Sequence, residues 1–198
     1  MNDSLTGLLV LGGFILLNAV LKMAYVALIN AHKARLRELA EEGNQRAEKA
    51  LSLAGDATRL LASQQLIDLL LRFSIALVAA VALAPPLDNV LVEQQANSTL
   101  ADMLAYGGVL LVVAIITLIF GEMLPANIAL GHADQIAMWS ASSINLLSRL
   151  LAPALQLMQW ISGQFAAPFV GRGSSSLVTE EEIKMMVDAG SEGGAIED

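Results

Sequence analysis

The chain has 198 residues, of which 56% are hydrophobic and 15% are charged, with a formal net charge of −8 and no cysteine. Apolar content at this level, gathered in long blocks, excludes an ordinary soluble domain and indicates an integral membrane protein. The acidic balance argues against nucleic acid as a partner and gives no reason to expect affinity for anionic lipid, and the lack of cysteine excludes disulfides and thiolate chemistry.

The first apolar run predicts a membrane span over residues 5–29, because a helix rises about 1.5 Å per residue. A polar segment rich in Ala, Leu, Glu, Arg and Lys follows. Its apolar positions recur at helical spacing, and Gly43 and Gly55 mark breaks. We therefore expect a helical hairpin over residues 31–63 that lies against the membrane or against a second copy.

Two further spans are predicted over residues 66–84, where Pro85-Pro86 follows, and over residues 103–121. Residues 87–102, between spans two and three, carry no lysine or arginine. The segment between spans one and two carries six basic residues: Lys33, Arg35, Arg37, Arg46, Lys49 and Arg59. Because cytoplasmic loops are rich in Lys and Arg, the hairpin is expected in the cytoplasm and the N-terminus outside.

The last apolar block, residues 136–170, is interrupted by Arg149, Pro153 and Pro168. It is compatible with one full span or with re-entrant or membrane-surface half-helices. The charge in mid-block favours the second interpretation, which returns the C-terminus to the cytoplasm.

The tail differs in composition from the rest of the chain. We expect residues 1–171 to form the transmembrane domain and residues 172–198 to form a cytoplasmic linker and the start of a helix. Thr179 and Glu182 form a capping box that opens this helix. The expectation is that the helix leads into a soluble regulatory region absent from this chain.

Phe120-Gly-Glu-Met-Leu-Pro125 places a carboxylate, Glu122, directly after an uncharged apolar run. An acid at the edge of hydrocarbon is costly unless a cation, a proton or a partner charge compensates it. Pro125 lacks an N–H, so a carbonyl near the acid loses its helical donor. Carboxylate and carbonyl oxygens suit a hard cation such as Mg²⁺. The alternative is a helix that ends at the membrane surface with Glu122 in water.

Three motifs together make the chain resemble the membrane domain of the CNNM/CorC family of magnesium transporters: Phe120-Gly-Glu-Met-Leu-Pro125, the basic stretch at residues 31–43, and Thr179-Glu-Glu-Glu-Ile-Lys-Met-Met-Val-Asp188. The resemblance implies an all-α fold with three transmembrane helices, a cytoplasmic helical hairpin, a juxtamembrane helix and a homodimer. The third motif is similar to the family's linker into paired cystathionine-β-synthase-type (CBS) domains. Nucleotide binding is therefore expected only through that absent region.

The resemblance also implies magnesium transport, in a bacterial or archaeal plasma membrane. The sequence has no phosphate-binding glycine loop, catalytic serine elbow or zinc motif, so no enzymatic activity is expected. Its metal site would comprise Glu122, Gly121 and Pro125, with Asp68 as the second acid. The homodimer and the lipid bilayer are the expected partners. His32 and His132 each lack a second ligand at metal spacing and are interpreted as interfacial residues.

Several polar positions depart from the family pattern. Lys22 and Tyr25 replace a serine and a glutamate in span one, Asp68 and Arg72 replace asparagines in span two, and Ala126 replaces a lysine after the proline. An ammonium group within about 4 Å of a metal site would repel the ion by roughly 4 kcal/mol for each charge pair.

These departures leave alternatives open. Lys22 could approach Glu122 or Asp68, which would make the chain a transport-deficient relative that acts as a scaffold or dimer partner. Lys22 and Glu122 could instead form a protonation pair for another solute. In the simplest alternative, Lys22 extends to the interface, and Asp68 pairs with Arg72, four residues away on one helix face.

Overall fold

The computed structural model describes residues 2–93 and 98–166, and every regular element in these ranges is helical. The described chain is therefore all-α, as predicted. It divides into two compact units, residues 1–155 and residues 156–198. The first unit holds the apolar helices, the hairpin and the candidate site. The expected domain boundary at residue 171, and the capping box of the tail, lie outside the described residues.

Three stretches of the described chain are long and apolar enough to cross a membrane: Leu5–Asn30, Ala57–Leu91 and Thr99–Gly131. The first is helix α1 (Asn2–Asn30). The second joins α4 (Ala57–Ala82) to α5 (Ala84–Glu93), and the third joins α6 (Ser98–Ile116), a π-helix η1 (Thr117–Met123) and α7 (Leu124–Gly131). The prediction of three spans is confirmed, with longer helices than expected.

The second span differs from its predicted limits at both ends. Asp56 caps α4 by accepting a hydrogen bond from the Arg59 backbone N–H at 3.1 Å, so the helix begins nine residues before the expected start. Residues 57–63, which the sequence assigns to the hairpin, therefore belong to α4. At the other end, Pro85-Pro86 occupies the first turn of α5, where a missing N–H costs no helical hydrogen bond.

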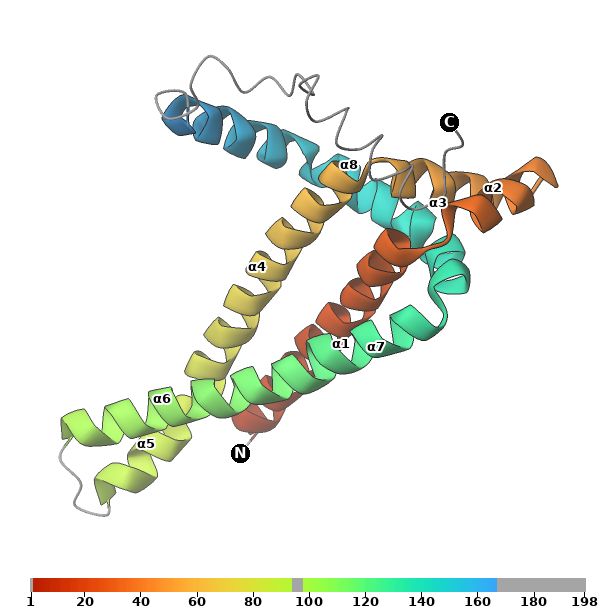
Figure 1. Cartoon of the computed structure of the whole chain (residues 1–198). Helices are drawn as coiled ribbons and strands as arrows, with labels where there is room; N and C mark the ends of the chain where they lie inside the picture. Colours follow the sequence, from red (N-terminus) through yellow and green to blue (C-terminus); the bar gives the residue numbers. More distant parts are fainter. Residues whose placement is uncertain (1, 94–97, 167–198) are drawn as a thin grey trace, which may run out of the picture. The chain divides into compact units, whose positions relative to one another are not determined.

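The hairpin consists of α2 (Lys33–Glu41) and α3 (Gln45–Gly55), which pack against each other between the end of α1 and the start of α4 (Figure 1). Gly43 adopts a φ of +90° at the turn, which explains why glycine stands there. The apolar face of the hairpin is buried in the main core, where Leu36 and Ala47 are fully inaccessible and belong to the same cluster as Leu28 of α1. A helical hairpin after the first span is confirmed, over residues 33–55 instead of the predicted 31–63, and both glycine breaks are confirmed.

Asn44 provides the N-cap of α3, since its side-chain oxygen accepts hydrogen bonds from the backbone N–H groups of Arg46 at 3.0 Å and Ala47 at 3.3 Å. We expect Asn44→Ala to lower the free energy of unfolding by about 1 kcal/mol, because two amide donors lose their acceptor. Denaturant titration in detergent micelles measures this loss. Asn44→Asp retains the acceptor and should stay within a few tenths of a kcal/mol of the native value; an equal loss in both variants would contradict the capping role.

Helix α8 (Ala133–Ala166) is continuous, so the expected pair of half-helices is wrong within the described residues. Pro153 lies inside it; a proline removes one backbone hydrogen bond, and the remaining bonds on both sides keep the helix intact. Ala137, Ala141 and Ile144 are buried in the main core. The expectation that this block lies along the membrane surface remains a prediction.

The start of α8 is held to the junction of α1 and α2. The Asp134 carboxylate accepts a hydrogen bond from the His32 backbone N–H at 2.8 Å, and the His32 ring nitrogen Nδ1 lies 3.3 Å from the same oxygen. Arg35 Nε approaches the second carboxylate oxygen at 3.9 Å. His32 therefore contacts a carboxylate that anchors α8.

Candidate functional site

Two ion pairs connect the apolar helices to one another. Lys22 Nζ of α1 lies 3.0 Å from Asp68 Oδ2 of α4, and both side chains are largely buried, at 17% and 16% exposure. Arg72 Nη2 of α4 lies 2.9 Å from one Glu122 oxygen and 3.0 Å from the other. Asp68 and Arg72 thus pair with two different neighbouring helices. Lys22 reaches Asp68, one of the two acids that the sequence proposed for it.

Glu122 lies in η1, where the Leu124 N–H donates to the Ile119 carbonyl five residues earlier. Pro125 follows at the start of α7 and has no N–H for the Gly121 carbonyl, its partner in an α-helical pattern. Asn18 of α1 supplies a donor instead, because its Nδ2 lies 3.1 Å from that carbonyl oxygen. Short π-helical segments within α-helices are frequent at functional sites.

The close approach of α1 to η1 depends on the missing side chain of Gly121. A Cβ at this position would lie 2.9 Å from Asn18 Nδ2 and 3.3 Å from Thr117 Cγ2. Asn18 is itself buried, with 2% exposure, so it has little room to move away. Gly121 is thus a packing position as well as the source of a carbonyl ligand candidate.

A cavity of about 340 Å³ lies beside the Arg72–Glu122 pair, between α4, α6 and η1. Apart from these two residues and Thr117, its lining is apolar. Thr117 Oγ1 is buried and has no hydrogen-bond partner in the described part of the chain. A buried polar atom without a hydrogen-bond partner is uncommon in proteins. Such an oxygen is a candidate to bind a cation or a water molecule.

The four residues predicted for the metal site are distributed over this region. Glu122 and Asp68 are each engaged by a cation, Gly121 offers a carbonyl that already accepts one hydrogen bond, and Pro125 is buried at the start of α7. Across residues 2–93 and 98–166, no group of three or more His, Asp or Glu side chains is placed to hold a metal ion. Their assignment as ion ligands stays a prediction.

Sequence reasoning missed Thr117, and it interpreted Asn18 as a helix-packing or interfacial polar group without identifying its partner. Both are polar residues inside apolar helices, and a polar group there must find a partner within the protein or a cavity. That rule selects them as site candidates. It does not indicate which helix they face, because the sequence alone does not determine how α1 packs on η1.

Comparisons with known proteins agree with this architecture. The family model described as the cyclin M (CNNM) transmembrane N-terminal domain matches residues 9–198. Among curated relatives, a UPF0053 protein of Synechocystis is 30% identical over 93% of this chain and 41% of its own length. The UPF0053 protein YhdT of Bacillus subtilis is 23% identical over 98% of the chain and 43% of its own length.

A third relative, from Haemophilus influenzae, carries the name polyamine export protein; it is 23% identical over 96% of this chain and 44% of its own length. The chain therefore spans less than half the length of each of these relatives.

Proposed function

Because this chain belongs to the CNNM family of transmembrane domains, we propose that it is the membrane part of a cation transporter, with magnesium as the cation. The observation that carries the proposal is the pair of carboxylates, Asp68 and Glu122, held by ion pairs within apolar helices. Acids within spans commonly mark ion pathways. The bacterial relatives and the three apolar helices support a plasma-membrane location.

A cation that binds these carboxylates would compete with Arg72 for Glu122 and with Lys22 for Asp68. The Arg72 side chain is 55% exposed and Lys22 is 17% exposed, so Arg72 is the less buried of the two cations that hold the acids. Magnesium would then find oxygen ligands in the Glu122 carboxylate, the Thr117 hydroxyl and the free lone pair of the Gly121 carbonyl. In this proposal Pro125 keeps that carbonyl out of the helical pattern, and Asp68 is the second acid.

The exposure of Arg72 also supports the proposed homodimer. A guanidinium that is half exposed on an apolar helix would face lipid in an isolated copy, which is costly. A second copy packed over α4 and the adjoining cavity would cover it.

A second candidate substrate is an organic polyamine. Lys22 places an alkyl-ammonium group 3.0 Å from Asp68, and the same chemical group ends a polyamine, which supports this candidate. The Haemophilus relative named polyamine export protein supports the same idea.

In a third possibility, Lys22 and Arg72 occupy the cation positions permanently and the chain is a transport-deficient dimer partner.

Ligand-dependent thermal stability of the purified protein tests these proposals. We expect saturable stabilisation by Mg²⁺ at constant ionic strength, of about 2.7 kcal/mol at a hundredfold excess over Kd. Glu122→Gln should abolish it, because the first carboxylate ligand is lost. Glu38→Gln, which removes an exposed acid of α2, is the matched control and should leave it unchanged.

The other results separate the alternatives. Stabilisation by spermidine but not by Mg²⁺ would assign a polyamine, and not magnesium, as the substrate. No stabilisation of the native chain, together with a magnesium response in Lys22→Ser, would show that the lysine has taken the place of the cation. The transport proposal would then be wrong for this chain.

A further inference from the structure

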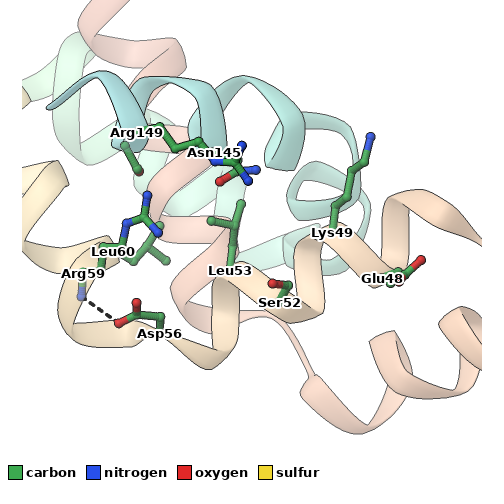
Figure 2. A pocket seen from close by; sticks show the side chains of 10 residues that line it. Glu48, Lys49, Ser52, Leu53, Asp56, Arg59, Leu60, Asn145 and Arg149 are labelled. Atoms are coloured by element: carbon green, nitrogen blue, oxygen red, sulfur yellow. Dashed lines mark hydrogen bonds between the residues drawn. The ribbon is translucent and has the colours of Figure 1, made fainter. Parts of the chain in front are cut away.

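A second cavity, of about 480 Å³, lies away from the ion pairs, where α3 and the start of α4 face α8. Three cationic side chains from three different helices line it: Lys49 of α3, Arg59 of α4 and Arg149 of α8. Figure 2 shows Arg59 and Arg149 on one side of this space, near Asn145, and Lys49 on the other side, next to Glu48. With two carboxylates also in the lining, the cavity has a formal charge of +1 in a chain with a net charge of −8.

The three cations have no anionic partner within 4.0 Å in the described parts of the chain. Two carboxylates also line the cavity, but Asp56 Oδ1 is engaged as the N-cap of α4, as the dashed line in Figure 2 shows. Glu48 lies at the edge of that view farthest from Arg59. The cavity thus presents unpaired guanidinium and ammonium groups and an amide donor, Asn145, to whatever enters it.

The position of the cavity indicates the source of the anion. Arg59 lies in the first turn of α4, at the end of an apolar stretch able to span a membrane, and so at the depth of lipid headgroups. On α8, Leu146 and Leu150 flank Arg149 in sequence and are each 72% exposed, and Leu61 of α4 is 51% exposed. Apolar surface beside a basic cavity matches a molecule with a charged head and apolar tails.

We propose that this cavity binds the phosphate group of an anionic phospholipid, with Lys49, Arg59 and Arg149 as its donors. Guanidinium groups match phosphate oxygens with two parallel hydrogen bonds, and basic pockets between helices at the membrane surface bind lipid headgroups. The bound lipid connects the hairpin to α8, so it fixes the position of α8 at the membrane surface. This site is independent of the proposed transport function.

Native mass spectrometry of the purified chain in a neutral detergent tests the site by titration with phosphatidylglycerol and with zwitterionic phosphatidylcholine. We expect the native protein to bind phosphatidylglycerol more tightly than phosphatidylcholine. Arg149→Gln should weaken that binding about tenfold, because one charge-assisted contact to phosphate is lost. Arg149→Lys, which keeps the charge, should retain most of the affinity.

Arg37→Gln is the matched control: it removes the same charge from an exposed position of α2 outside the cavity and should change the affinity less than twofold. Lys49→Gln, also at an exposed position, provides a second cavity variant should Arg149→Gln fold poorly. Equal binding of the two lipids, or equal losses in cavity and control variants, would overturn the proposal. Displacement of the lipid by millimolar inorganic phosphate would assign the cavity to a soluble phosphate instead.

Discussion

Replacing Lys22 with methionine is expected to lower the free energy of unfolding by about 3–5 kcal/mol. The Asp68 carboxylate, 16% exposed and 3.0 Å from the lysine ammonium, would then lie within an apolar helix without a partner charge. The cost of leaving one member of a buried pair unpaired exceeds the net contribution of the pair itself. Unfolding in mixed micelles, followed by circular dichroism, measures the change.

The double variant Lys22→Met with Asp68→Leu separates these two quantities. Removing both charges should recover most of the stability, so the two single losses should not add. A loss below about 1 kcal/mol for Lys22→Met alone would instead match a lysine that extends to the membrane surface. That result would also remove the argument that Lys22 occupies a cation position.

Gly121→Val is expected to lower the free energy of unfolding by about 2–4 kcal/mol, because its side chain would collide with Asn18 and Thr117 and break the bond from Asn18 to the Gly121 carbonyl. Thermal unfolding in detergent measures the loss. Gly108→Val is the control, since a Cβ there meets no atom within 4 Å. It should be neutral or stabilising, because valine favours helix more than glycine does.

The part played by Asn18 can be measured separately. In an Asn18→Ala background the additional cost of Gly121→Val should shrink, since the atom nearest the new side chain is gone. An undiminished cost would mean that Thr117, rather than Asn18, limits the space around Gly121.

Local sequence patterns predicted most of the fold. Apolar runs longer than a bilayer is thick require helices, because no water within lipid can satisfy backbone groups, so three spans follow from composition alone. Gly43 and the periodic leucines likewise predicted the hairpin, since a positive φ and a helical stripe are local properties. The half-helices expected around Pro153 failed because one proline removes a single hydrogen bond from a long helix.

The sequence by itself thus determined that the chain is a helical membrane protein with acids and bases at specific depths in its spans. Only the tertiary structure decided which of them meet: Lys22 with Asp68, Arg72 with Glu122, and Lys49, Arg59 and Arg149 around one cavity. Depth along a helix follows from counting residues. Rotation about its axis changes by about 100° with each residue, so helix packing alone selects the partners.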